Sequence, residues 1–212
     1  MFNHVAKGPV MKLYYAKSTC SLSPHIVLLE AGLPFTLEKI DFALKKMSDG
    51  TDYLTINNKG TVPALQLDDG NVLTEGPAII QYLADQKPES ALAPRAGTLE
   101  RYRLMEILNY ITSEVHKGFG PLFNPKISAD WKASTIADLG KKFDWLSGFL
   151  GSKTYLMGST FTVADAYLFT VLSWSEHVGI DLGKWPVLSA YHSRVAQRPK
   201  VREALKAEGS LQ

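Results

Sequence analysis

The stretch that decides the fold is "YYAKSTCSLSPHIVLLE", residues 14–30. It overlaps residues 12–16, "KLYYA", a short run rich in aromatic residues that predicts a buried strand. Small polar residues follow as a loop, and Ser23 with Pro24 is typical of the start of a helix. Cys20, the only cysteine of the chain, lies in that loop, between the predicted strand and the predicted helix.

The residues that follow extend this α/β pattern. Residues 35–42, "FTLEKIDF", alternate apolar and polar side chains, which predicts a second strand. Residues 62–75, "VPALQLDDGNVLTE", predict a hairpin with a type I′ turn at Asp69 and Gly70. Residues 76–86, "GPAIIQYLADQ", predict a helix, because a proline is tolerated in a first helical turn. The order of elements indicates a small α/β domain.

Beyond residue 97 only helical patterns appear. Residues 98–119 and 128–151 repeat apolar side chains at helical spacing. Residues 162–174, "TVADAYLFTVLSW", are apolar nearly all round, which predicts a central buried helix. Thr162 and Asp165 have the spacing of a capping box and predict where this helix begins. We therefore predict an all-helical second domain.

These patterns divide the chain into four parts. Residues 1–10 lack the apolar core of a secretion signal, and we interpret them as a leader, an upstream start or an expression remnant. We predict the α/β domain over residues 11–87 and the helical domain over residues 98–212. A linker rich in Pro, Ala and polar residues, 88–97, would join them.

The composition excludes several classes of protein. Of the 212 residues, 45% are hydrophobic and 21% are charged, as in ordinary globular proteins. The net charge of +2 is spread along the chain, which argues against a nucleic acid or an acidic membrane surface as partner. One cysteine cannot form an internal disulfide, and C-x-x-C metal pairs are absent from the sequence. We expect a reducing, cytoplasmic location.

Five stretches, taken in order from Met11 to the C-terminus, resemble the bacterial beta class of cytosolic glutathione transferases. They are "CSLSPHI", "NNKGTVPAL", "LTEGPAIIQYLAD", "NYITSEVHKGF" and "FTVADAYLFTVLSW". The resemblance implies an α/β thioredoxin-like N-terminal domain plus an all-α C-terminal helical domain, and a homodimer. It also implies glutathione as co-substrate, with no metal or redox cofactor.

Cys20 is the first candidate catalytic residue. A lone cysteine is usually a small buried hydrophobe, but this one precedes a predicted helix, whose free N–H groups favour a thiolate. The resemblance implies that Cys20 contacts the sulfur of bound glutathione or forms a mixed disulfide with it. Tyr15, at the end of the first strand, is the rival group, and core packing is its alternative role.

The resemblance also implies how the first domain binds the tripeptide. Val62, before a cis proline at position 63, would present its backbone to the cysteinyl part, as an added strand does. Glu75 would receive the amino group, and Gly76 would offer its N–H to a carboxylate at a helix start. Many relatives carry serine in place of Gly76, so one hydroxyl is missing here. Lys45 would meet the glycyl carboxylate, although the adjacent lysine leaves the register open.

The second domain supplies further candidates. Asn109, Ser113 and His116 are spaced by four and three residues, which predicts one shared helix face. The resemblance places His116 near the sulfur, where it could donate a hydrogen bond to a thiolate or relay a proton. Glu114 and Val115 are expected to line the same site, Glu114 by crossing a dimer interface.

A pocket for the second substrate is expected from Phe119, Phe123 and Trp174, for which core packing is the alternative. The sequence therefore predicts a transferase that conjugates glutathione to hydrophobic electrophiles. Two alternatives are glutathione-dependent disulfide reduction through Cys20 and a transferase-like binding protein without catalysis.

Overall fold

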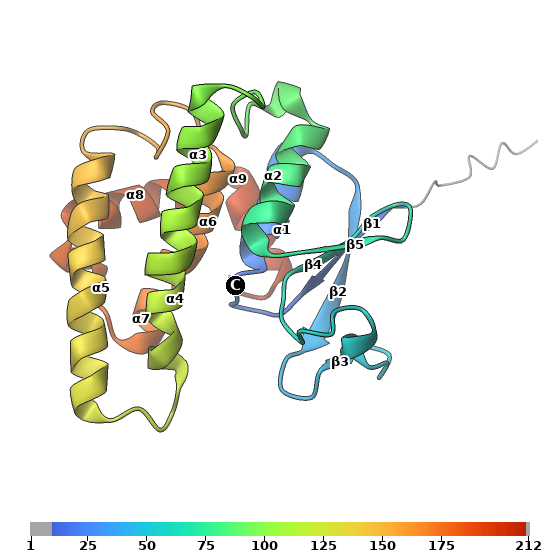
Figure 1. Cartoon of the computed structure of the whole chain (residues 1–212), viewed down its shortest axis with the longest axis horizontal. Helices are drawn as coiled ribbons and strands as arrows, with labels where there is room; N and C mark the ends of the chain where they lie inside the picture. The colour runs from blue at the N-terminus through green and yellow to red at the C-terminus, as the bar shows by residue number, and fades with distance from the viewer. Residues whose placement is uncertain (1–9, 211–212) are drawn as a thin grey trace, which may run out of the picture.

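The structure is a computed structural model that describes residues 10–210. Within these residues, five strands form one sheet in the order β3-β2-β1-β4-β5 (Figure 1). Their bounds are β1 Met11–Tyr15, β2 Phe35–Asp41, β3 Lys46–Met47, β4 Ala64–Gln66 and β5 Val72–Thr74. Only the β1–β2 pair is parallel, and the remaining neighbours are antiparallel. The central position of β1 explains why all of its residues except Lys12 are buried, because both of its faces are covered.

Two helices, α1 Leu22–Ala31 and α2 Gly76–Gln86, accompany this sheet. Helix α1 packs against α2, α6 and α9 as well as β1, so nearly all of its circumference is buried. It ends at Gly32, whose φ of 65° lies in the left-handed region that suits glycine. The predicted strand–loop–helix unit is confirmed, with Cys20 two residues before the first residue of α1.

The predicted hairpin is present, but its turn differs from the type I′ prediction. Gly70 has a positive φ of 87° and Asp69 does not, whereas a type I′ turn needs positive φ at both central residues. The Asp69 carboxylate instead accepts a hydrogen bond from the backbone N–H of Asn71 at 2.9 Å. This local side-chain bond favours a longer loop between β4 and β5.

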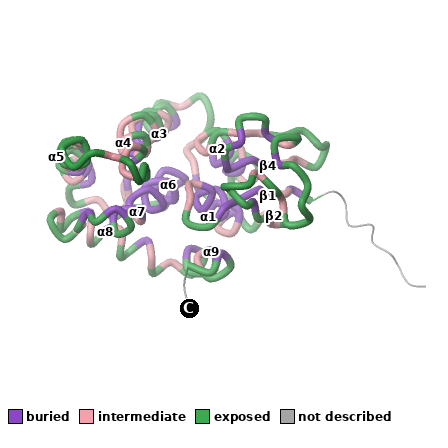
Figure 2. The backbone as a smooth tube through the Cα atoms, turned by 90° about the horizontal axis from the view of Figure 1, so that it is seen from below, coloured by how far each residue is buried: buried purple, intermediate pink, exposed green. Residues whose placement is uncertain are grey.

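The remaining part of the chain is helical, as predicted. Its α-helices are α3 Leu99–Tyr110, α4 Lys117–Phe119, α5 Ala129–Leu150, α6 Val163–Leu172, α7 Trp174–Val178, α8 Pro186–Ala196 and α9 Pro199–Ala207. A π-helical turn, Ile111–His116, joins α3 to α4. Every residue of α6 is buried, and Figure 2 shows α1 and α6 in purple at the centre of the molecule. The prediction of a central buried helix is confirmed.

The start of α6 is held by the predicted capping box. Asp165 accepts hydrogen bonds from the backbone N–H of Thr162 and from that of Leu156, both at 2.8 Å. The Tyr191 hydroxyl donates to the same carboxylate at 2.9 Å. Burial raises the pKa of Asp165, and the hydrogen bonds oppose this shift. A carboxylate that caps one helix thus also ties α6 to α8.

Between Gln86 and Leu99 the chain forms loops and one short 3-10 helix, Pro88–Ser90. Arg101 bridges this connection with a two-pronged ion pair to Asp85, at 2.8 and 2.7 Å. The division at residues 88–97 stays a prediction, and the leader predicted for residues 1–10 lies, apart from Val10, outside the described residues. Over residues 10–210, no helix has the length and apolarity that a membrane span requires.

Candidate functional site

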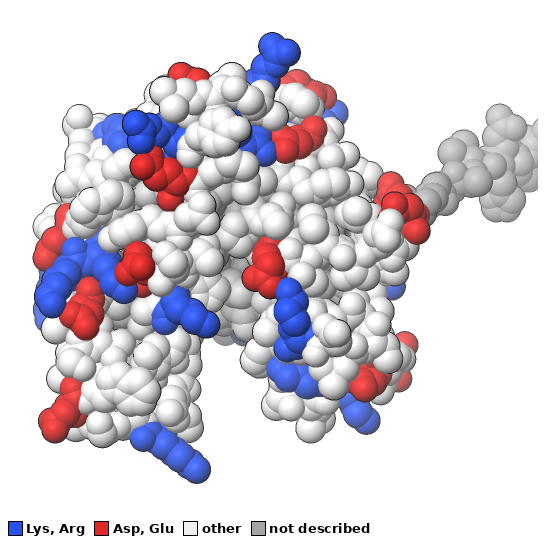
Figure 3. Space-filling view, viewed as in Figure 1, with Lys and Arg blue, Asp and Glu red and all other residues white. Residues whose placement is uncertain are grey.

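A cavity of about 420 Å³ opens between the sheet and the helical part of the chain. Figure 3 shows a hollow between the two halves of the molecule, with charged side chains on its rim. The cavity is lined by Thr19, Cys20, Phe42, Lys59, Thr61, Val62, Pro63, Glu75, Gly76, Pro77, Thr112, His116, Lys117 and Tyr167. Its size suits a small organic ligand. It joins the loop before α1, the approach to β4, the start of α2 and the π-helical turn.

Cys20 lies on the wall of this cavity and is half-buried. Its Sγ donates a hydrogen bond to the carbonyl oxygen of Val62 at 3.2 Å. Burial raises the pKa of the thiol to about 12; the residue's own backbone N–H opposes the shift, and the charge of Glu75 adds to it. The expectation that the helix start would favour a thiolate is therefore wrong. Loss of water around the sulfur outweighs the attraction of the helix N-terminus.

His116 lies on the same cavity, at the end of the π-helical turn. Its Nδ1 is 2.6 Å from the hydroxyl oxygen of Tyr167, and its ring meets that of Trp174 edge-on, with centroids 4.8 Å apart. Burial, aided by the charge of Lys117, lowers the pKa of His116 to about 4, so the ring is neutral at pH 7. Burial raises the pKa of Tyr167, which keeps its proton available for Nδ1. The imidazole can then carry its own proton on Nε2.

Two other candidates on this helix do not line the cavity. Asn109 and Ser113 are exposed and outside the cavity lining, whereas Thr112 takes part in it. The predicted shared face assumed α-helical geometry, but residues Ile111–His116 form wider π-helical hydrogen bonds. Such a turn contains more residues than an α-helical one, so positions spaced by four and three lose their common face.

Glu114 and Val115 were expected to line the site, but within a single chain their side chains lie elsewhere. The Glu114 carboxylate is 3.2 Å from Nζ of Lys142 on α5, and Val115 is fully buried in the core. Neither side chain lines the cavity of its own chain. A contribution of Glu114 to a partner's site stays a prediction.

The start of α2 combines a residue with a strained backbone, Glu75, with a glycine on the cavity wall, Gly76. The Val62–Pro63 peptide bond is cis, as the resemblance implied. Glu75 adopts φ 70° and ψ 114°, a region that residues other than glycine rarely occupy. Gly76, the first residue of α2, follows it on the cavity wall. Val62, Glu75 and Gly76 therefore lie together on one cavity, although they come from separate segments.

The lysine expected at the site, Lys45, lies beside the cavity without lining it, and its contact with the glycyl carboxylate stays a prediction. Lys45 donates from Nζ to the carbonyl oxygen of Gly60 at 2.8 Å, and the same ammonium lies 3.5 Å from the ring centroid of Phe42. It braces the neighbouring loop and does not line the cavity. Lys59, which does, is ion-paired with Glu75 and donates to Thr74 Oγ1 at 2.9 Å. The stretch "NNKGTVPAL" contains Lys59 three residues before Val62, which was a usable signal.

The expected apolar pocket is only partly present. Phe119 is fully buried and packs against Phe143 and Trp174, which agrees with its core-packing alternative. Phe123 is half exposed and meets Trp174 edge-on, with centroids 5.6 Å apart. Tyr15 is buried in the core and lies outside the cavity lining, which agrees with its packing alternative.

The arrangement brings a protonated thiol, a neutral imidazole and two ammonium groups, those of Lys59 and Lys117, to one cavity. Hydrogen-bond donors of this kind stabilise an anionic ligand and, in particular, a negative sulfur. Within residues 10–210, no three or more His, Cys, Asp or Glu side chains gather closely enough to hold a metal ion.

Comparisons with known proteins identify the family of this chain. The family model described as "Glutathione S-transferase, N-terminal domain" matches residues 17–86, and "Glutathione S-transferase, C-terminal domain" matches residues 110–199. Glutathione S-transferase GstA of Escherichia coli O157:H7 is 46% identical over 199 residues, which cover 94% of this chain and 99% of that protein.

Solved structures give the same result. A sphingomonad glutathione S-transferase complexed with glutathione is 46% identical, with a TM-score of 0.91 over 94% of this chain and all of the other. The bacterial beta class enzyme of Sphingomonas chungbukensis is 50% identical, with a TM-score of 0.91 over 94% of this chain and 100% of that one. This chain therefore belongs to the glutathione S-transferase family, and bacterial beta class enzymes are among its structural neighbours.

Proposed function

We propose that the chain conjugates the thiol of reduced glutathione to hydrophobic electrophiles. One observation carries this proposal: the Cys20 thiol, the Val62 backbone and the start of α2 share a single cavity of about 420 Å³. A thiol peptide with two carboxylates needs donors for its sulfur, an extended backbone edge and anion sites. We assign these roles to Cys20 and His116, to the Val62 backbone and to the start of α2, all of which line this cavity.

The tripeptide would bind along the cavity wall. Its cysteinyl part would pair with the backbone of Val62, and its γ-glutamyl carboxylate would meet the free N–H groups at the start of α2. The exposed carboxylate of Glu75 would receive the amino group. Lys59 and Lys117 would replace Lys45 as the cations that face the glycyl carboxylate, because both line the cavity.

The raised pKa of Cys20 sets its role in this chemistry. With a pKa of about 12, Cys20 keeps its proton at neutral pH and acts as a donor. Its S–H, now bonded to Val62, and an Nε2–H on His116 could both turn to the glutathione sulfur and stabilise its thiolate. Lowering the glutathione thiol pKa from about 8.5 to about 6–7 would raise the thiolate fraction at neutral pH roughly tenfold or more.

The reaction then needs no further group from the protein. The glutathione thiolate attacks an electrophilic carbon, a C–S bond forms, and a leaving group such as halide departs with its bonding electrons. The released thiol proton passes to solvent. Glutathione-dependent disulfide reduction is disfavoured as the main activity, since a protonated Cys20 is a poor nucleophile.

A Cys20→Ser variant tests the proposal. Conjugation of 1-chloro-2,4-dinitrobenzene should persist at a reduced rate, because a hydroxyl can still donate to the sulfur. Loss of mixed-disulfide reduction alone would show that the thiol serves redox chemistry instead. Lack of turnover by the unmodified protein with several electrophiles, together with no retention on a glutathione resin, would contradict the proposal.

The homodimer belongs to the same proposal. The side chains of Leu99 and Tyr102 on α3 are 66% and 61% exposed, and Trp145 on the neighbouring α5 is 46% exposed. Tyr110 links the two helices by contacting Trp145, with ring centroids 4.2 Å apart. Exposed large apolar and aromatic side chains of this kind are typical of an interface. We expect Glu114 to reach the partner's cavity in this dimer.

Light scattering after size-exclusion chromatography checks the assembly. The unmodified protein should elute as a dimer, and Tyr102→Glu should shift it to a monomer, whereas a monomeric unmodified protein would refute the assignment. A cytoplasmic location completes the proposal, because a reducing compartment maintains glutathione as the thiol.

A further inference from the structure

The loop before β4 is anchored at one carbonyl group, that of Thr61. The Tyr53 hydroxyl and the side-chain amide nitrogen of Asn57 both donate hydrogen bonds to the Thr61 carbonyl oxygen, each at 2.7 Å. Tyr53 is 0% exposed and Asn57 is 3% exposed, so water does not compete for these donors. A carbonyl oxygen has two lone pairs and can accept both bonds. The Thr61 carbonyl is therefore held toward Tyr53 and Asn57.

Each of the two donors is itself held in place. Burial raises the pKa of Tyr53 to about 12, so its hydroxyl keeps the proton that it donates at neutral pH. The side-chain oxygen of Asn57 accepts a hydrogen bond from the backbone N–H of Lys59 at 3.2 Å, which fixes the orientation of the amide group. The Asn57 backbone also donates to the Tyr53 carbonyl oxygen at 3.0 Å and accepts from the Gly60 N–H at 2.8 Å. These bonds oppose any rotation of the Thr61 carbonyl.

The orientation of this carbonyl sets the direction of the next N–H group. The peptide bond between Thr61 and Val62 is not cis. In a planar trans peptide bond, the C=O of one residue and the N–H of the next point in opposite directions. Because the Thr61 carbonyl is bound to Tyr53 and Asn57, the Val62 N–H points away from both of these side chains. Thr61 and Val62 line the glutathione cavity, whereas Tyr53 and Asn57 lie behind it.

The Val62 N–H has no acceptor in the described part of the chain. Val62 precedes β4 and takes no part in its strand pairing, and its N–H donates no hydrogen bond within residues 10–210. Its carbonyl oxygen, in contrast, accepts the S–H of Cys20 at 3.2 Å. Val62 is buried, and the backbone N–H groups of buried residues almost always have a partner. A free donor on a cavity wall therefore points to an acceptor that a ligand supplies.

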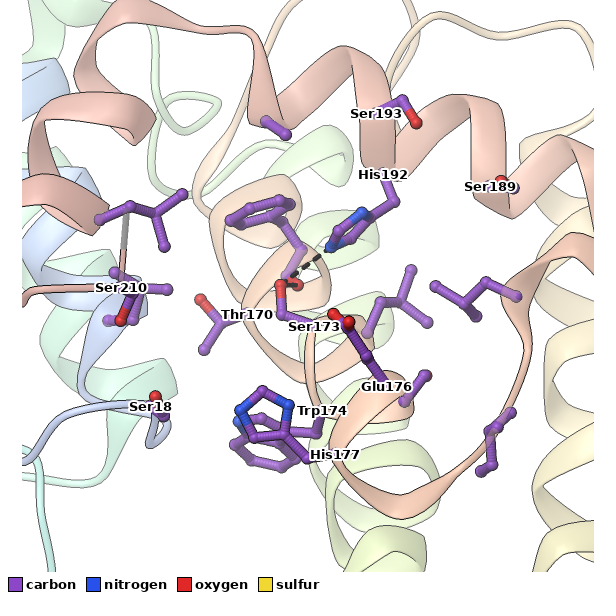
Figure 4. Close-up of a pocket in the computed structure, with 18 of the residues that line it drawn as sticks. Ser18, Thr170, Ser173, Trp174, Glu176, His177, Ser189, His192, Ser193 and Ser210 are labelled. Atoms are coloured by element: carbon purple, nitrogen blue, oxygen red, sulfur yellow. Dashed lines mark hydrogen bonds between the residues drawn. The ribbon is translucent and has the colours of Figure 1, made fainter. Parts of the chain in front are cut away.

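A second cavity shows that volume alone does not mark a binding site. It measures about 620 Å³ and lies among α6, α7, α8 and α9, and it shares only Thr19 with the glutathione cavity. Figure 4 shows Ser173 and His192 on its wall, joined by a hydrogen bond of 2.9 Å. These two side chains satisfy each other, whereas the Val62 N–H in the smaller cavity is left free.

We propose that Tyr53 and Asn57 are positioning residues for glutathione. By holding the Thr61 carbonyl, they direct the Val62 N–H toward the carbonyl oxygen of the cysteinyl residue before the ligand arrives. The inference rests on the proposed function, because it assumes that the tripeptide pairs with the Val62 backbone. A donor that is fixed in advance loses less conformational entropy on binding, which strengthens affinity without changing the chemical step.

Two ligands that differ in one acceptor test this role. S-methylglutathione carries the cysteinyl carbonyl, and its analogue with an (E)-alkene in place of the Cys–Gly peptide bond keeps the shape without that oxygen. Isothermal titration calorimetry with the full-length protein gives a Kd for each ligand, and the ratio of the two Kd values measures the hydrogen bond from Val62. The unmodified protein should bind the alkene analogue at least about tenfold more weakly.

Tyr53→Phe removes one of the two donors to Thr61 and keeps the aromatic ring. It should raise the Kd of S-methylglutathione about fivefold and lower the ratio to less than about threefold, because the Thr61 peptide is then less firmly held. Asn57→Ala should shift the ratio in the same direction. The kcat at saturating glutathione should stay within about twofold of the unmodified value, since Cys20 and His116 are unchanged.

Tyr14→Phe is the matched control. Tyr14 is 2% exposed and packs against Tyr53, with ring centroids 5.8 Å apart, but its hydroxyl donates to Gln66 and not to Thr61. This variant loses a hydroxyl from the same cluster without touching the loop carbonyl. It should change neither Kd.

Three outcomes would overturn the inference and leave the proposed conjugation intact. The first is a Kd ratio near one in the unmodified protein, and the second is an unchanged ratio in Tyr53→Phe. The third is an equal fall of the ratio in Tyr14→Phe, which would assign the effect to loosening of the sheet. If the unmodified protein binds neither ligand, the proposed function fails, and this inference fails with it.

Discussion

Replacing Gly76 by serine should tighten glutathione binding. Gly76 is the first residue of α2 and does not adopt a positive φ, so a side chain is compatible with its backbone. A Cβ added there would have the Pro63 Cγ as its nearest neighbour, at 4.0 Å, which is an ordinary van der Waals contact. The new hydroxyl would stand at the cavity wall, beside the N–H groups that we assign to the γ-glutamyl carboxylate.

The size of the effect follows from the type of bond added. A hydrogen bond to a charged group is worth about 1.5–3 kcal/mol, and a neutral one about 0.5–1.5 kcal/mol. Because the serine side chain loses some freedom on binding, we expect about 1 kcal/mol, or roughly a fivefold lower Kd for glutathione. Isothermal titration calorimetry measures this Kd, and the KM for glutathione with 1-chloro-2,4-dinitrobenzene should fall in parallel.

Gly76→Ala is the matched control, since it adds the same Cβ without the hydroxyl. Both variants should raise the melting temperature slightly, because either residue restricts the unfolded chain more than glycine does. Only Gly76→Ser should lower the Kd. If Gly76→Ala tightens binding equally, or if Gly76→Ser weakens it, the assignment of the carboxylate to this helix start is incorrect.

Three other predictions concern the same cavity. Lys59→Ala should raise the KM for glutathione about tenfold and Lys45→Ala much less, because only Lys59 lines the cavity. If steady-state kinetics show the larger effect for Lys45→Ala, then Lys45 and not Lys59 meets the glycyl carboxylate. Cys20, with a thiol pKa of about 12, should react with iodoacetamide at pH 8 at least about 100-fold more slowly than in the urea-unfolded chain, and comparable rates by mass spectrometry would contradict the burial argument. The pKa of His116 is lowered from 6.5 to about 4, so as the pH drops the unfolded chain takes up this proton before the folded chain does. The free energy of unfolding should therefore fall by up to about 3 kcal/mol as the pH drops from 6.5 through 4. His116→Gln should flatten that part of the pH–stability curve measured by urea unfolding, and an unchanged slope would show that this ring is not the group involved.

Local patterns were sufficient for most of the fold. The strand before Cys20, the helix after it and the buried helix α6 each follow from side-chain spacing within about fifteen residues. The capping box at Thr162 was predictable for the same reason, because its hydrogen bonds join residues three apart in the chain. Interactions this local need no knowledge of what packs around them.

The π-helical turn was not predictable in this way. Residues Ile111–His116 carry no sequence mark that separates a π-helical from an α-helical turn, and their spacing suggested an ordinary helix face. The wider turn removed Asn109 and Ser113 from the cavity lining and left Thr112 and His116 in it. This segment packs against α5 and α6, and only the tertiary structure supplies those contacts.

By itself, the sequence determined the order of the elements and put one thiol in front of a buried helix, because both depend on neighbours along the chain. Only the tertiary structure decided the state of that thiol. The Val62 carbonyl that accepts its proton comes from 42 residues away, and the walls that exclude water from Cys20 come from both halves of the chain. Desolvation depends on everything that surrounds an atom, so it is a property of the folded chain and cannot be seen in the residues beside the cysteine.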